Sequence, residues 1–306
     1  MILRMNSNAL KRVKESEFKL EKEIQTLVEN NLEELLSLKF VATEFSIEKF
    51  RFDSVAYDEE SKAFVIIEYK KGKNESLVDQ GLSYLNTLLK RKADFVLLFN
   101  ETFSANKGLK DFEWSQTKVI FISPKFTTFQ LNAALFKNIP FSFYEIRKFE
   151  SDLIEFNEVQ FEKEDTVDFD LMNDEQDDVK KEIKVFTEDD HLNNGSDLTK
   201  ELYLNLKDRI IALGNDVRIE YKQLYVAFKA TRNFCDVTLK KGHLRVAINL
   251  QKGSLIDNNH FAKLMIKDDG TIIGHWGNGD YQCDVTDESQ LDYLITLIRQ
   301  SYNANK

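Results

Sequence analysis

Apolar positions in the first hundred residues follow two kinds of spacing. At Glu17–Ser37 they recur every three or four residues, and the same spacing returns at Glu75–Lys92, so both stretches predict amphipathic helices. Short apolar or alternating runs predict the strands Phe40–Ile47, Lys49–Tyr57, Ala63–Lys70 and Ala93–Phe99. The predicted order is therefore αβββαβ.

The next elements complete a first domain. The pattern predicts a strand at Val119–Ile122, a helix at about 127–136 and a strand at Phe141–Ile146. Alternation of strands and helices over residues 1–148 indicates an α/β domain with a mixed sheet flanked by helices.

The remaining residues divide into an acidic stretch and a second domain. Residues 149–195 are dense in acids and are interpreted as a linker or draped arm. Residues 196–306 begin with a helical period, continue with short alternating strands that include one at Thr271–His275, and end in a helix near 288–302. We expect a smaller α+β domain there.

Charge is unevenly distributed along the chain. The 306 residues carry 42 Lys and Arg against 52 Asp and Glu, a formal net charge of −10. Residues 150–190 alone hold 17 acids and 4 Lys, a net charge of −13, and subtracting this from −10 leaves +3 for all other residues. The acidic total therefore does not exclude a nucleic-acid partner.

Cysteine content and hydropathy indicate the cellular compartment. Cys235 and Cys283 are far apart and neither belongs to a CxxC pair, so neither a disulfide framework nor a structural zinc site is expected. No apolar run approaches the roughly 20 residues of a membrane span, and no signal-peptide core follows the basic N-terminal residues. We expect a cytoplasmic protein that does not contact membranes.

The strand predicted at Ala63–Lys70 ends in charges that burial alone does not explain. Its apolar part runs directly into Glu68, Tyr69 and Lys70. Because strand side chains alternate, Glu68 and Lys70 share one face. If the preceding turn holds an even number of residues, Asp53 falls on that face too, opposite Glu68 or on the diagonal. Two carboxylates beside a lysine favour a site for a hard divalent cation.

Asp53, followed after fourteen residues by Glu68-Tyr69-Lys70 in the αβββαβ order, resembles the PD-(D/E)xK nuclease superfamily. The resemblance implies a restriction-endonuclease-like fold and metal-dependent hydrolysis of phosphodiester bonds, in DNA rather than RNA. Asp53, Glu68 and the main-chain carbonyl of Tyr69 would then hold Mg²⁺ or Mn²⁺. Lys70 would orient or polarise the attacking water.

Two further features extend the resemblance over about residues 15 to 100. Gln80 and Tyr84, four apart on one face of the next predicted helix, look like the Q-x-x-x-Y motif of the RecB-like branch. They would position the nucleic-acid strand or brace the metal ligands. Glu23, in EKEIQTLVENNLEELL, looks like the helical acid of these nucleases, in a stretch similar to NucS-type nuclease domains. It would complete a metal shell.

Basic residues close to these positions in sequence are expected to neutralise phosphates of a bound nucleic acid. They are Arg51, Lys71, Lys73, Lys90, Arg91 and Lys92, with Lys11, Arg12 and Lys14 upstream.

The C-terminal domain has its own resemblance. With the stretches LYVAFKATRNFCDV and LDYLITLIRQSY, it looks like an uncharacterised bacterial domain whose members are often labelled predicted transport protein. The lack of an apolar span gives that label no support. We expect a module that recognises substrate, a protein partner or a second copy of the chain.

Two other functions stay open. The first is a catalytically inactive protein that keeps the nuclease fold and binds nucleic acid or protein, and the second is a scaffold whose two domains both bind proteins. Glu68 and Lys70 would then form an ordinary salt bridge at a strand end. The joint presence of both acids and the lysine favours catalysis.

Overall fold

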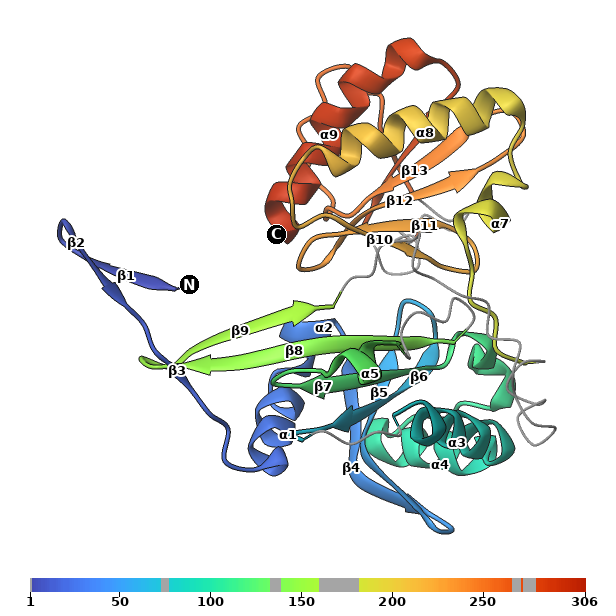
Figure 1. Ribbon diagram of the computed structural model, residues 1–306. Helices are drawn as coiled ribbons and strands as arrows, with labels where there is room; N and C mark the ends of the chain where they lie inside the picture. The colour runs from blue at the N-terminus through green and yellow to red at the C-terminus, as the bar shows by residue number, and fades with distance from the viewer. Residues whose placement is uncertain (1, 73–76, 133–138, 160–181, 266–270, 272–278) are drawn as a thin grey trace. The chain divides into compact units, whose positions relative to one another are not determined.

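The computed structural model describes residues 2–72, 77–132, 139–159, 182–265, 271 and 279–306 (Figure 1). The chain divides into two compact units, Met1–Val185 and Phe186–Lys306. Each unit has a main sheet and a hydrophobic core of its own. The domain boundaries drawn from the sequence at 148 and 196 stay predictions.

A mixed seven-stranded sheet organises the first unit. Its strands are β3 (Glu15–Ser16), β4 (Lys39–Ile47), β5 (Phe50–Asp58), β6 (Ala63–Tyr69), β7 (Lys118–Ser123), β8 (Phe141–Phe149) and β9 (Leu153–Glu158). Their order is β3-β8-β7-β6-β5-β4, with β9 also paired to β8. β7 is parallel to both β6 and β8, and the other pairs are antiparallel. The mixed sheet predicted from the sequence is present.

Helices cover both faces of this sheet. They are α1 (Glu21–Glu29), α2 (Leu32–Leu36), α3 (Leu77–Lys90), α4 (Lys92–Phe103), α5 (Thr128–Asn132) and the short 3₁₀ helices η1 (Leu109–Asp111) and η2 (Trp114–Gln116). Ile24 of α1 joins Ile67 in one core, and Phe95 of α4 joins Phe64 in the other. Every residue of β6 is buried, as expected for an apolar strand covered on both faces.

The strand predicted at Ala93–Phe99 is wrong, because these residues lie within α4. Phe95 and Phe99, four apart, are buried, whereas Leu97 between them is 58% exposed, which is the helical period and not the strand period. A short continuous apolar run does not distinguish a buried strand from a buried helix. The αβββαβ order is thereby corrected, since a second helix precedes β7.

Two other segments differ from the prediction. The single helix expected at Glu17–Ser37 is two helices, α1 and α2, interrupted at residues 30–31. The range 149–195, predicted as a linker or arm, contains β9 and the helix α7 (Glu188–Leu192), while its residues 160–181 lie outside the described residues.

A six-stranded antiparallel sheet organises the second unit. Its elements are α8 (Asp197–Ile211), β10 (Arg218–Tyr221), β11 (Val226–Lys229), β12 (Asn233–Leu239), β13 (Leu244–Ile248), β14 (Lys263–Leu264), β15 (Tyr281–Val285), η7 (Glu288–Gln290) and α9 (Leu291–Asn305). The strand order is β10-β11-β12-β13-β15-β14. Leu206 of α8 and Ile298 of α9 share one core with Val237. The strand predicted at Thr271–His275 falls, apart from Thr271, outside the described residues.

Among the described residues, no helix is long and apolar enough to cross a membrane.

The correction at α4 makes a direct prediction about stability. In the helix Phe95 packs in the core and Leu97 does not, whereas in a strand the two would share a face. We expect Phe95→Ala to lower the free energy of unfolding by about 3–5 kcal/mol and Leu97→Ala to change it by less than about 0.5 kcal/mol. Urea denaturation of the two variants checks this. Comparable losses for both would contradict the helix.

Candidate acid–lysine site at the end of β6

Two charged side chains lie almost out of water where β6 ends. Glu68 is 3% exposed and Lys70 is 9% exposed. Lys70 Nζ donates to Glu68 Oε1 at 2.7 Å. The backbone holds them in place, because Glu68 pairs with Phe121 of the parallel strand β7 and the Lys70 N–H donates to the Ile122 carbonyl at 2.9 Å. Isolated buried charges would cost several kcal/mol each, so the pairing is required.

Asp53 reaches the same place from β5. The loop between β5 and β6, residues 59–62, holds four residues, and Ser54 stands opposite Ile67, so the register carries Asp53 toward Glu68. Asp53 Oδ2 accepts the Tyr69 N–H at 3.1 Å.

Asp53 and Glu68 interact electrostatically. Burial raises the pKa of Asp53, against the lowering effect of the Tyr69 N–H and the Lys70 charge. Burial, followed by the charge of Asp53, raises the pKa of Glu68. A positive charge between the two acids would therefore stabilise the ionised form of each.

Gln80 and Tyr84 enter the site from α3. Gln80 Nε2 donates to Glu68 Oε1 at 2.5 Å and lies 2.7 Å from the Tyr84 hydroxyl. That hydroxyl donates to the Arg51 carbonyl at 3.2 Å. Burial raises the pKa of Tyr84 far above its usual value, so Tyr84 stays protonated. The helical spacing of four thus places both side chains against one strand end.

One oxygen of Glu68 accepts no hydrogen bond. Lys70 and Gln80 both contact Oε1, whereas Oε2 is buried without a hydrogen bond. An unsatisfied buried acceptor is costly, and a cation is one ligand that would remove the cost for a carboxylate oxygen. Asp53 and Glu68 supply two acidic groups, and the described residues contain no cluster of three or more His, Cys, Asp or Glu that could hold a metal. Mg²⁺ is commonly held by one or two carboxylates together with water and substrate phosphates.

Glu23 does not join this cluster. It is exposed, and its Oε2 accepts the Lys19 N–H at 2.8 Å at the start of α1. Glu21, two residues earlier, accepts the Lys71 N–H at 2.8 Å, and its charge contributes to raising the pKa of Asp53. The acid of α1 whose charge acts on Asp53 is thus Glu21, which the sequence analysis did not single out.

A second polar network behind Asp53 was also missed. Gln25 Nε2 donates to the Asp53 carbonyl at 2.8 Å and to Glu29 Oε1 at 3.0 Å. Ser54 Oγ donates to the same Glu29 oxygen at 2.6 Å and lies 3.1 Å from the Tyr69 hydroxyl. The spacing of Gln25 and Glu29 on one helix face was the available signal.

Of the basic residues proposed as phosphate ligands, Arg51 acts on the site through its charge, which opposes the rise in the pKa of Asp53. Arg51 pairs with Glu44 at 3.3 Å. Lys90 lies ten residues beyond Gln80 on α3, or about 15 Å along the helix axis. Arg91 pairs with Asp94 at 2.9 Å, and Lys92 pairs with Glu182. Lys71 Nζ donates to the Lys19 carbonyl at 2.6 Å. Lys73 lies outside the described residues.

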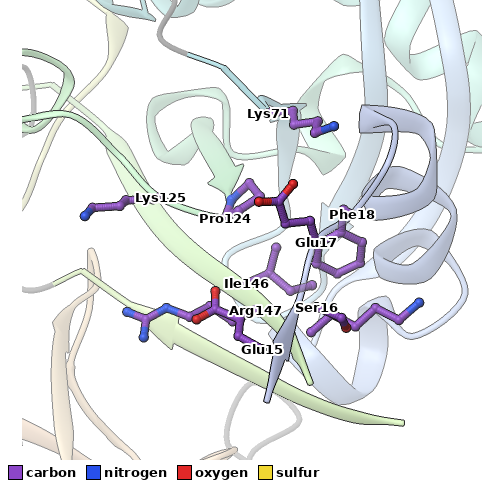
Figure 2. A pocket seen from close by; sticks show the side chains of 10 residues that line it. Glu15, Ser16, Glu17, Phe18, Lys71, Pro124, Lys125, Ile146 and Arg147 are labelled. Carbon is purple, nitrogen blue, oxygen red and sulfur yellow. The ribbon is translucent and has the colours of Figure 1, made fainter. Parts of the chain in front are cut away.

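A pocket of about 460 Å³ opens at the carboxyl ends of β6, β7 and β8, and none of Asp53, Glu68 and Lys70 lines it (Figure 2). Its lining includes Lys71, which directly follows Lys70 in the chain. The charged lining residues are Glu15, Glu17, Lys71, Lys125, Arg147 and Lys148, four cations against two acids. Figure 2 shows Phe18 and Ile146 among these charged side chains, so the pocket lining combines apolar residues with mainly cationic ones.

Fold and site together define a two-unit α/β protein with a buried acid–lysine cluster. The chain is 41% identical over 294 residues to an uncharacterised protein from Haemophilus influenzae, and the match covers 95% of this chain and 96% of that protein. The chain therefore belongs to the same protein family as the Haemophilus influenzae protein. Residues 188–305 match the model of a domain of unknown function, DUF5655.

Some solved structures resemble parts of the chain. A repair endonuclease from Pyrococcus abyssi is 17% identical, with 39% of this chain and 43% of that chain covered and a TM-score of 0.22. A complex of EndoMS with double-stranded DNA is 16% identical, covering 44% and 50%, with a TM-score of 0.24. Pyrococcus furiosus SfsA with Ca²⁺ is 14% identical, covering 45% and 61%, with a TM-score of 0.24. Less than two thirds of each structure is spanned, and these TM-scores assign no activity.

The raised carboxyl pKa values predict that Asp53→Asn stabilises the metal-free protein more at pH 7 than at pH 4. A carboxyl whose pKa is raised by folding contributes stability that is fully present below its unfolded pKa of about 3.9 and is lost as pH rises through the folded value. Asparagine stays neutral and keeps an acceptor for the Tyr69 N–H. Urea denaturation in EDTA at several pH values measures the difference between variant and wild type. Glu101→Gln, an exposed acid on α4, is the control; a stability difference for Asp53→Asn that does not change with pH would contradict the raised pKa of Asp53.

Proposed function

We propose that this protein is a metal-dependent nuclease that hydrolyses phosphodiester bonds, in DNA in preference to RNA, through a PD-(D/E)xK-type site. The supporting observation is the buried Glu68 Oε2 that lacks a hydrogen bond beside Asp53 and Lys70. Burial raises the pKa of both acids, which favours a cation as their missing partner.

The donor set fits Mg²⁺ or Mn²⁺. Asp53 and Glu68 would hold the ion, with the main-chain carbonyl of Tyr69 as a further oxygen donor. When bound, such an ion neutralises charge on the phosphate and lowers the pKa of a bound water.

The protein's own residues would orient these groups. Lys70 and Gln80 donate to Oε1 of Glu68 and so fix the carboxylate with Oε2 directed away from both donors. The Tyr69 N–H fixes Asp53 in the same way. Lys70 has further N–H donors with which to orient a water or a phosphate oxygen. Tyr84 stays neutral and braces Gln80.

A nuclease fold that binds nucleic acid or protein without turnover is the second candidate. The observation that favours it is that Lys70 and Gln80 already occupy one oxygen of Glu68, and that the described residues bring only two acids to the site as candidate ligands. We assign the C-terminal domain the choice of substrate or protein partner in either case.

The catalytic proposal predicts which substitutions abolish cleavage. Incubation with linear, circular and single-stranded DNA and with RNA, in Mg²⁺ or Mn²⁺, should show cleavage by wild type. Loss of an outer contact to a metal ligand costs about 10–100-fold, so Gln80→Ala should fall in that range and Asp53→Ala or Glu68→Ala should exceed it. Glu101→Gln on α4 should cleave at the wild-type rate. Equal rates in wild type and Asp53→Ala, or no cleavage with either metal, would contradict the proposal that the protein is an enzyme.

Metal binding has a readout that does not depend on cleavage. A ligand that binds only the folded state stabilises it by about 2.7 kcal/mol at one hundred times its dissociation constant. We expect Mg²⁺ to raise the melting temperature of wild type and to leave that of Asp53→Asn unchanged. Differential scanning fluorimetry with and without EDTA measures both. A shift of the same size in the two proteins would place the metal elsewhere.

A further inference from the structure

The first two strands form a hairpin that pairs with no other strand among the described residues. β1 (Leu3–Asn6) and β2 (Ala9–Arg12) make a separate two-stranded sheet, joined by Ser7 and Asn8. Ser7 has a positive φ of 54°, which suits a two-residue turn between twisted strands. Every residue of both strands is exposed.

The base of the hairpin is fixed to the first unit. Val13 is buried, and its N–H donates to the Ile2 carbonyl at 3.0 Å. The Glu150 N–H donates to the Lys14 carbonyl at 2.9 Å. β3 then pairs with β8 at the edge of the main sheet. The chain that follows the hairpin is therefore attached to the edge of the main sheet at Lys14–Ser16.

The hairpin gains little from its own contacts. Two-stranded hairpins are at best marginally stable in water. Arg4 stands directly opposite Lys11, and like charges in that position destabilise a pair of strands. Met5 and Leu10, paired on the opposite face, are 73% and 64% exposed. An anionic partner would remove the repulsion and cover the ribbon.

Charge identifies the partner. Residues 1–14 contain Arg4, Lys11, Arg12 and Lys14 and no acid, a net charge of +4 in a chain of −10. None of the four forms an ion pair with an acid in the described part of the chain. Lysine and arginine bind nucleic-acid phosphates with release of counterions, and a two-stranded ribbon fits the major groove of duplex DNA.

We propose that the β1–β2 hairpin is a DNA-binding ribbon, whose Arg4 and Lys11 contact the phosphate backbone of duplex DNA. The inference rests on the proposed function for the choice of DNA as the partner. A second copy of the chain fits less well, because two hairpins of charge +4 repel each other.

The test measures binding with cleavage prevented. A fluorescent 30-base-pair duplex is titrated with the full chain in EDTA, and anisotropy is followed from 50 to 200 mM salt. Arg4→Thr/Lys11→Thr removes two charges and keeps residues that favour strands. Each lost phosphate contact lowers the salt slope by about one and affinity at 0.1 M salt by about eightfold. We expect a slope change of about two.

Lys107→Thr/Lys110→Thr is the matched control, because it removes two exposed lysines of the same unit far along the chain. Equal losses of DNA affinity in both double variants, or no loss in either, would contradict the proposal that the hairpin binds DNA. So would wild-type binding to phosphatidylserine vesicles but not to DNA, or a dimer in sedimentation that the hairpin variant abolishes. Hairpin-dependent binding without cleavage in Mg²⁺ supports the ribbon and rejects the nuclease, whereas cleavage with hairpin-independent binding does the reverse.

Discussion

The ion pair of Lys70 and Glu68 stands where a strand buried on both faces comes to an end, and the neighbouring elements are arranged around it. Two charges almost removed from water would each cost several kcal/mol without partners. Lys70 Nζ at 2.7 Å and Gln80 Nε2 at 2.5 Å stabilise one oxygen of Glu68. They leave the other oxygen buried and unbonded. Packing alone does not account for that second oxygen, since an apolar residue at the same position would avoid its cost.

The partner from α3 depends on how closely that helix lies on the sheet. Gly81 follows Gln80, and a Cβ at Gly81 would lie 2.5 Å from Cζ of Phe141 and 3.0 Å from Cζ of Phe121. Any side chain there would push the helix outward or displace those rings. A glycine inside a helix costs about 1 kcal/mol relative to alanine, and here it lets the amide of Gln80 reach Glu68. Helix stability is thus reduced at the position where the site needs close approach.

Sequence reasoning succeeded where a short-range rule fixes the geometry. Strand alternation and a four-residue hairpin loop were enough to bring Asp53 toward Glu68, and a spacing of four was enough to place Gln80 with Tyr84. It failed where the outcome depends on tertiary packing. The apolar run at 93–99 is too short and continuous for its spacing to separate strand from helix, and in the structure Phe95 and Phe99 pack into the aromatic core as helix positions.

The choice among acids on α1 failed for the same reason. Glu21 and Glu23 are both exposed acids in the first turn, and their spacing does not say which one approaches Asp53. That depends on where the helix begins relative to the sheet, and on the bond from the Lys71 N–H to Glu21. The basic residues were chosen by sequence proximity alone, and three of the six, Arg51, Arg91 and Lys92, pair with acids.

Charge balance in the site explains why a cation and an anionic substrate would depend on each other. Asp53 and Glu68, when ionised, contribute −2 and Lys70 contributes +1, so the site would repel a phosphate. A divalent cation would change that balance from −1 to +1 in a place where low dielectric strengthens every interaction. The same ion would bind Glu68 Oε2 and offset the burial and the charge of Asp53, which together raise the pKa of Glu68. Phosphate affinity and carboxylate ionisation would therefore be coupled through a single buried position.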